Sequence, residues 1–268
     1  MTAKDEHLAL TSGIGLAGMA VTNFWSYSQE AFKVFKEEII DCIVKPNKKT
    51  AVHWYLSFFQ DISEEIHQIK NNLDMEYAFN VMRNVLDEVN LRPNLQVPDF
   101  EGCADECGHF DCDCSEVIDK WINYINENNH EIDELIIHSA FQFIFQDRKF
   151  LHDFHLELSH LIEEEMGMII ENYPEYVTNK RRFKRQYFPE WLKTGVFYRD
   201  KGTCVICRCD LSNLIRIQNK INIDHIIPLN VYGSNDASNM QLLCGKCNTT
   251  KGDRTTETSS VNVPFWNL

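Results

Sequence analysis

Through the first two thirds of the chain, hydrophobic residues recur at spacings of three and four, as on one face of an α-helix. Four such stripes are Phe32, Phe35, Ile39 and Ile43; Phe58, Ile62, Ile66, Ile69 and Leu73; Ala78, Met82, Val85 and Val89; and Val117, Ile118, Trp121, Ile122 and Ile125. They predict amphipathic helices that each bury one face, and Ser115 is a suitable N-cap for the last of them. A further pair of helices is expected between Ile132 and about Ile170, with a break near Asp147.

The segment from Leu8 to Trp25 is apolar and uncharged, and it contains three glycines. Its length is near the lower limit for a helix that crosses a membrane, but the glycines and polar residues within it favour a buried core helix. A membrane anchor is the alternative interpretation. The residues before it lack the basic segment of a secretory signal, so we expect a cytoplasmic protein.

The hydrophobic pattern changes near residue 174. A short helix is expected at residues 190–198, and β-branched residues at 221–227 predict a strand that leads into a loop. Residues 239–244 predict a second ordered segment, and residues 248–251 are expected to begin or lie in a helix. Short elements of both kinds indicate a small α+β domain after the helical region.

Charge divides the chain at about the same place. The 268 residues have a formal net charge of −14, but residues 179–268 carry 14 Lys and Arg against 7 Asp and Glu. Their charge is therefore +7, which leaves −21 on residues 1–178. We expect a mainly α-helical acidic domain over residues 1–178 and a small α+β domain over residues 179–268. The basic domain attracts polyphosphates and the acidic domain repels them.

A basic segment joins the two predicted domains. It contains Lys180, Arg181, Arg182, Lys184 and Arg185, with Phe183 and Tyr187 among them. Two interpretations are equally open: a solvated linker, or an arm that contacts the phosphates of a nucleic acid.

Nine of the ten cysteines fall into two clusters, and the close spacing within each cluster suits a metal better than disulfides. Cys204 and Cys207 form one CxxC pair, and Cys244 and Cys247 form another. Four thiolates complete a tetrahedral zinc site with no open position, which indicates a structural role. Cys209 is not expected to be a zinc ligand.

The two CxxC pairs enclose polar residues in a definite order. These are Asp224-His225-Ile226-Ile227-Pro228-Leu229, then Asn239 before Cys244, and Asn248 with Lys251-Gly252 after Cys247. In this order and spacing, residues 187–254 resemble the zinc-bearing HNH endonucleases. Tyr232-Gly233 stands where many members have a pair of glycines. The resemblance does not extend to the N-terminal region.

The resemblance implies a ββα-metal fold in which His225 is the general base. It also implies that Asp224 and Asn248 hold one catalytic Mg²⁺ or Mn²⁺, and that Asn239 pins the loop so that His225 points correctly. The residue types suit this chemistry, because a neutral imidazole accepts a proton near pH 7 and hard cations prefer oxygen ligands. Lys251, one helical turn after Asn248, is expected to contact a phosphate.

These observations predict a metal-dependent endonuclease under the control of the acidic domain, which binds a regulatory partner or self-associates. The resemblance implies DNA as the substrate, in preference to RNA. The combination resembles effectors of anti-phage defence. The alternative is a non-catalytic zinc-knuckle adaptor that binds nucleic acid or protein. An adaptor has no need of Asp224, His225 and Asn248, so their joint presence favours the nuclease.

A second cluster within residues 103–114 comprises Cys103, Cys107, His109, Cys112 and Cys114. Five soft or borderline ligands in one short loop indicate a second structural zinc site. An unmetallated or redox-sensitive loop is the alternative.

Three histidines, His152, His155 and His160, lie on one predicted helix with acidic neighbours. We expect surface histidines on a polar helix face, with a further metal site as the alternative.

Overall fold

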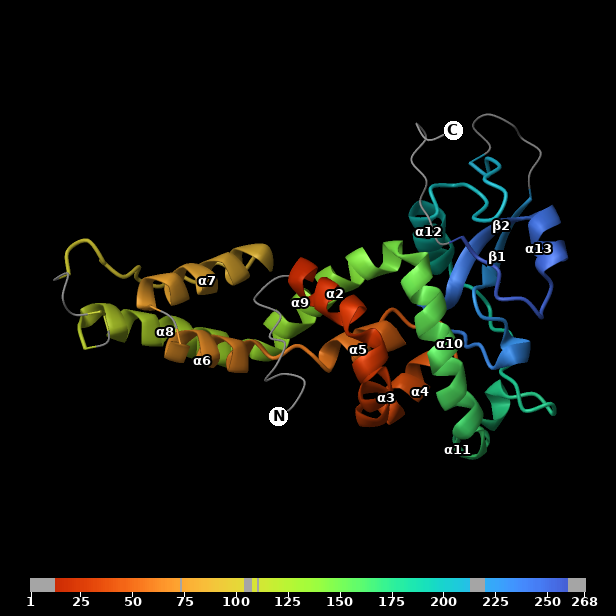
Figure 1. Ribbon diagram of the computed structural model, residues 1–268, viewed down its shortest axis with the longest axis horizontal. Coiled ribbons are helices and arrows are strands. Elements are labelled where there is room, and N and C mark those ends of the chain that lie inside the picture. Colours follow the sequence, from red (N-terminus) through yellow and green to blue (C-terminus); the bar gives the residue numbers. More distant parts are fainter. Residues whose placement is uncertain (1–12, 73, 104–107, 110, 213–219, 260–268) are drawn as a thin grey trace. The chain divides into compact units, whose positions relative to one another are not determined.

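The computed structural model describes residues 13–72, 74–103, 108–109, 111–212 and 220–259. It is largely α-helical, with one two-stranded antiparallel sheet near the C-terminal end (Figure 1). The predicted fold class, a mainly helical protein with a small α+β region and a four-cysteine cluster, is confirmed.

The chain forms two compact units, which divide it differently from a boundary at residue 178. The first comprises residues 1–22 and 56–143, and the second comprises residues 23–55 and 144–268. The second unit thus combines helices from the acidic region with the whole basic region. The division into domains at residues 1–178 and 179–268 stays a prediction.

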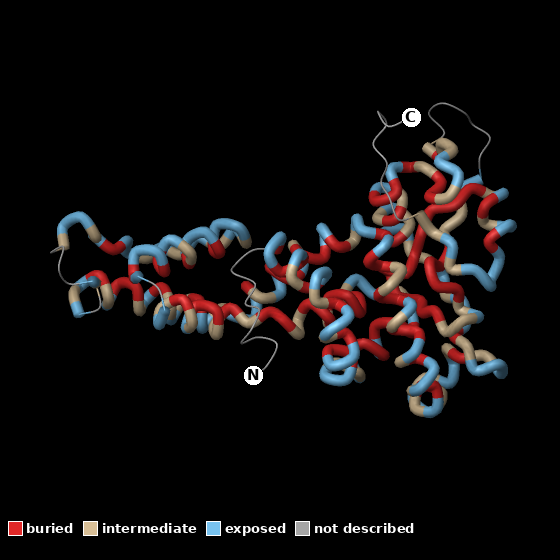
Figure 2. Tube along the Cα trace, in the orientation of Figure 1, coloured by how far each residue is buried: buried red, intermediate tan, exposed pale blue. Residues whose placement is uncertain are grey.

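Helices α6 (Ile62–Asn72), α7 (Met75–Glu88) and α8 (Asp113–Glu127) pack side by side in the first unit (Figure 1). The unit also contains α2 (Gly13–Thr22) and most of α9 (Asn129–Gln146). The buried positions follow the predicted stripes along these helices (Figure 2), and they include Ile62, Ile66, Ile69, Ala78, Met82, Val85, Val117, Ile118, Trp121 and Ile125. Leu73 lies outside the described residues.

The predicted N-cap of α8 is wrong. The helix begins at Asp113, and its N-cap is Cys112, which has an extended backbone with φ −131°. Ser115 lies inside the first turn, where its backbone N–H donates to Cys112 O. Asp113 and Glu116 also lie in this first turn, where negative charge stabilises the positive end of the helix dipole.

The predicted core helix over residues 8–25 is interrupted. Helix α2 ends at Thr22, and α3 (Phe24–Val34) begins after Asn23. Leu16, Ala17 and Ala20 of α2 are buried, as expected for a core helix. Residues 8–12 lie outside the described ranges. Among the helices of the described ranges, none is long and apolar enough to cross a membrane.

The second unit places helices around a β-hairpin. Its elements are α3, α4 (Lys36–Ile43), most of α5 (Ala51–Ser57), α10 (Arg148–Glu164), α11 (Met166–Asn172), the 3₁₀ turn η1 (Pro174–Tyr176), α12 (Glu190–Arg199), β1 (Ile221–His225), the 3₁₀ turns η2 (Leu229–Val231) and η3 (Ala237–Asn239), β2 (Met240–Cys244) and α13 (Gly245–Lys251). The strands pair antiparallel, with Ile221 opposite Cys244 and His225 opposite Met240. Helix α13 packs on both strands, and α12 packs on β2.

The predicted break near Asp147 is confirmed, because its side chain caps α10 by accepting hydrogen bonds from the backbone of Lys149 and Phe150.

A buried carboxylate joins α10, α12 and β2. Asp200 accepts hydrogen bonds from Arg199 at 2.9 and 3.0 Å and from Arg148 at 3.0 Å. It also accepts one from the backbone N–H of Leu242 at 2.8 Å. Every charge in this group is buried and paired. Removing one partner would leave another charge buried and uncompensated, which would lower the stability of the fold. The network therefore holds β2 against the helices that flank it.

The histidines of α10 are not all on the surface, so that prediction is wrong for His155. Its ring is buried, and its Nε2 lies 2.9 Å from Ser238 Oγ beside the hairpin. His160 is exposed, as expected. Burial, with additional coulombic effects of His225, Arg199 and His152, lowers the pKa of His155 to about 3.

We expect His155 to make the free energy of unfolding depend on pH. Between about pH 6.5 and 3 the unfolded chain binds a proton that the buried ring does not, so stability falls as the pH is lowered through this window. His155→Gln should flatten this slope in urea unfolding measured at several pH values. His160→Gln, at an exposed position of the same helix, should keep the wild-type slope; equal slopes in all three proteins would contradict the assignment.

Candidate active site

Asp224 and His225 are the last two residues of β1, and they are 9% and 3% exposed. Both line an open pocket of about 570 Å³, within the usual range of ligand sites. Asn248 of α13 lines the same pocket. The hairpin and the helix that follows it therefore bring three of the predicted site residues together.

The basic segment forms one wall of this pocket, to which Lys180, Arg182 and Arg185 contribute. Arg182 Nε donates to Asn230 O at 2.9 Å, and Arg185 Nη2 donates to Ile223 O at 2.8 Å. These contacts hold the segment against the hairpin instead of leaving it as a free linker.

His225 is oriented by Asn235, in the turn between the strands. The Asn235 amide donates to Val44 O at 3.0 Å and to Lys184 O at 2.9 Å. Its Oδ1 accepts from the backbone N–H of Gln186 at 3.3 Å and lies 3.4 Å from His225 Nε2. Since Oδ1 only accepts, this pairing requires the proton of a neutral His225 ring on Nε2. Nδ1 is then the nitrogen that can accept a proton.

The surroundings of His225 keep its ring neutral. Burial, together with the positive charges of Arg185 and Lys251, lowers the pKa of His225 to about 3, although the Asn235 contact acts in the opposite direction. The imidazole is therefore available as a proton acceptor at neutral pH.

Asn239 closes the loop that follows His225. Its Oδ1 accepts from the Ile227 backbone N–H at 2.9 Å, and its Nδ2 donates to Ile227 O at 3.0 Å and to Ser234 O at 2.9 Å. The side chain is 0% exposed. These contacts have the form that a loop-pinning residue requires.

Gly233, in the same loop, has no room for a larger residue. A Cβ there would lie 1.9 Å from Ile227 O, so this close approach of two backbone segments requires glycine.

The four cysteines of the two CxxC pairs, Cys204, Cys207, Cys244 and Cys247, meet at one end of the hairpin. Their sulfurs all lie within 4.8 Å of one another, and those of Cys207 and Cys244 are 3.8 Å apart. Zn–S bonds of about 2.3 Å in a tetrahedron place sulfurs about 3.8 Å apart. The quartet clusters as a zinc site, as predicted. Cys209 is not one of its members.

Residues 204–254 match the family model described as HNH endonuclease. The chain carries an HNH endonuclease domain there. Comparisons of the chain with curated proteins and with solved structures found no match. The match begins after the basic segment, so the cationic wall of the pocket lies outside it.

The oxygen donors of the HNH domain fit a hard divalent cation. Asp224 Oδ2 is buried, and the Lys251 ammonium lies 2.9 Å from it as an ion pair. Asn248, half-buried on the same pocket, offers a neutral amide oxygen. A carboxylate and an amide are ligands that Mg²⁺ and Mn²⁺ accept.

Lys251 is not placed where a contact with a phosphate requires it to be. It is 3% exposed, and its ammonium donates to His225 O at 2.8 Å while pairing with Asp224. It is thus used inside the HNH domain, where it ties α13 to the end of β1.

Sequence reasoning missed Asn235, which lies in a polar segment that resembles an ordinary turn. Nothing local in the sequence distinguishes this asparagine from its neighbours. Its partners, Val44 and Lys184, are remote in the chain, so only the tertiary structure identifies it.

Asn239→Ala should lower the free energy of unfolding by about 2–4 kcal/mol, because it removes three buried hydrogen bonds and leaves the Ile227 N–H without its acceptor. Urea unfolding measures the loss. Asn230→Ala is the matched control at an exposed position, and it should stay within about 0.5 kcal/mol of wild type. A loss no larger than that of the control would show that the loop does not depend on Asn239.

Proposed function

We propose that this protein is a metal-dependent endonuclease that hydrolyses phosphodiester bonds in DNA. One observation carries the proposal: Asp224, His225 and Asn248 line a single pocket, bordered by cations that attract a phosphate backbone. The HNH match supports a function in the nuclease family. DNA is the proposed substrate because the resemblance to HNH endonucleases implies it.

In this proposal His225 Nδ1 accepts the proton of the attacking water. Asn235 holds the opposite edge of the ring, and Asn239 fixes the loop that leaves the strand. Asp224 and Asn248 would hold a divalent cation, which when bound acts as a Lewis acid on the phosphoryl oxygen. The buried Lys251 ammonium balances the Asp224 carboxylate and steadies the carbonyl of His225.

We further propose that helices of the second unit control the HNH domain. Asp236 Oδ2 accepts from the Ala51 backbone N–H at 2.7 Å, at the start of α5. The neighbouring Asn235 contacts both Val44, at the end of α4, and the His225 ring. Movement of these helix ends would therefore reorient the proposed base. A regulatory partner or a second copy of the chain would act through the acidic helical region. The role in anti-phage defence stays a prediction.

His225→Ala should reduce cleavage of supercoiled plasmid by at least about 100-fold in the presence of Mg²⁺ or Mn²⁺, because it removes the proton acceptor. Zinc content and DNA binding should persist, since His225 is neither one of the four cysteine ligands nor one of the cations proposed to bind phosphate. Gel electrophoresis of the plasmid measures cleavage.

His160→Ala is the matched control, at an exposed histidine of α10, and it should cut like wild type. Undiminished cutting by His225→Ala would refute the assignment of the base. The alternative, a non-catalytic adaptor, would be supported if the wild-type protein bound DNA but cut neither DNA nor RNA with either cation.

Lys180→Ala and Arg185→Ala should each weaken DNA binding similarly across sequences and reduce the slope of log affinity against log salt by about 1. Fluorescence anisotropy at several salt concentrations measures both quantities. Lys33→Ala, an exposed lysine on α3, is the control and should leave the slope unchanged. Unchanged slopes in both wall variants would mean that this wall does not contact phosphates.

A further inference from the structure

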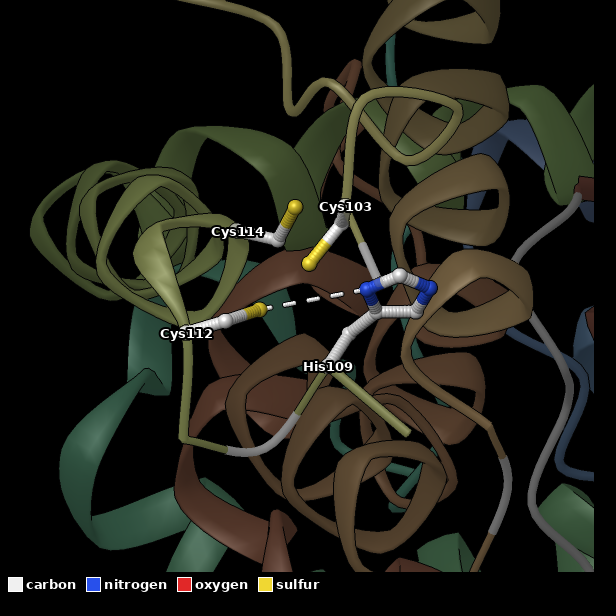
Figure 3. A group of neighbouring side chains, drawn as sticks. All are labelled: Cys103, His109, Cys112 and Cys114. Atoms are coloured by element: carbon white, nitrogen blue, oxygen red, sulfur yellow. Dashed lines mark hydrogen bonds between the residues drawn. The ribbon is translucent and has the colours of Figure 1, made fainter. Parts of the chain in front are cut away.

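The first unit contains a second convergence of metal-ligating side chains, separate from the HNH domain. Cys103 and His109 come from the loop between α7 and α8, and Cys112 and Cys114 come from the start of α8 (Figure 3). The ligand atoms of all four lie within 4.8 Å of one another. The predicted fifth member, Cys107, lies outside the described residues.

The spacing of these atoms matches the requirements of a tetrahedral metal. Cys112 Sγ and His109 Nδ1 are 3.8 Å apart, the same separation as Cys207 and Cys244 in the HNH cluster. Bonds of about 2.3 Å to sulfur and about 2.0 Å to nitrogen place tetrahedral ligands between about 3.5 and 3.8 Å apart. The quartet thus needs only a small closure to enclose one ion.

The backbone presents these ligands in a defined way. Gly108 and His109 both have positive φ, of 56° and 60°, which is uncommon for histidine and turns its ring toward the cysteines (Figure 3). Cys112 is the N-cap of α8, and Cys114 lies in its first turn and is 4% exposed. Thiolates are stabilised at this position, because the N-terminal end of a helix carries partial positive charge.

The loop itself buries little apolar surface among its described residues. Between Leu86 and Cys114, Pro98 is the one apolar residue that is buried among the described residues. Long loops without secondary structure are uncommon in compact domains. A loop with so little apolar burial needs another source of stability, and a bound metal supplies it in many small domains.

The cluster is also connected to the helices beside it. The His109 ring meets the Phe100 ring edge to face at 5.0 Å, and Phe100 meets Phe79 of α7 at 5.9 Å. Phe79 contacts Trp121 of α8 at 5.2 Å. An ion at the cluster would therefore fix the loop to both α7 and α8.

We propose that Cys103, His109, Cys112 and Cys114 bind one structural Zn²⁺ ion, which staples the loop at residues 89–112 to α7 and α8. Three thiolates and one imidazole are a ligand set that zinc accepts in closed sites. The set contains no open position for a substrate. The second zinc is independent of the proposed nuclease activity.

The test is the zinc content of the purified full-length protein, measured by elemental mass spectrometry. Two zinc ions per chain are expected. Cys112→Ser and His109→Ala should each retain one, and so should Cys207→Ser, which removes the HNH site instead. His109→Cys, which restores a fourth ligand, should retain two, and this variant separates loss of a ligand from general damage to the fold.

His130→Ala is the matched control, at an exposed histidine of the same unit, and it should retain two zinc ions. The proposal would be overturned if the wild-type protein contained one zinc ion per chain and Cys112→Ser also contained one. Recovery of Cys103 and Cys112 as a disulfide from protein alkylated at lysis would also overturn it. Either result leaves the nuclease assay unaffected, so the two proposals fail separately.

Discussion

The register of the hairpin is the constraint on which the candidate site depends. β1 pairs with β2 so that Ile221 lies opposite Cys244 and His225 lies opposite Met240. One end of this ladder reaches the cysteine quartet, and the other reaches Asn239, which holds the chain just beyond His225. A slip of one residue would exchange the two faces of β1, so that Asp224 and His225 would each point to the face opposite their present one. Anchors at both ends exclude that slip.

Buried polar contacts attach this hairpin to the surrounding helices. Asp200 joins β2 to α10 and α12, while His155 of α10 contacts Ser238. Asn235 and Asp236 contact the backbone at Val44 and Ala51. Polar groups without water are costly unless their partners are in place, so these contacts define one arrangement of the helices around the hairpin. The HNH domain is consequently built into the second unit.

Charge is distributed to suit a nucleic acid in spite of the negative total. The basic segment is held against the hairpin by Arg182 and Arg185, which contact backbone carbonyls and still line the pocket. Positive charge therefore lines one wall of the pocket. The same charge lowers the pKa of His225 and favours its neutral ring. In the proposed function, Arg185 would thus serve both phosphate binding and the neutrality of the base.

The sequence by itself determined the elements and the chemistry. Helical stripes such as Ile62, Ile66 and Ile69 are visible locally because burial of one face imposes a period of 3.6 residues. The spacing of the cysteines was equally readable, since a tetrahedral zinc site constrains ligand type and number, whereas Asp224, His225 and Asn248 were singled out by the resemblance to HNH endonucleases. Tertiary structure alone decided the rest. It buried His155 against Ser238, turned Lys251 inward onto Asp224 and brought Asn235 to His225. These polar side chains have no periodic signature, and their positions depend on partners that lie far away in the chain and become neighbours only when it folds.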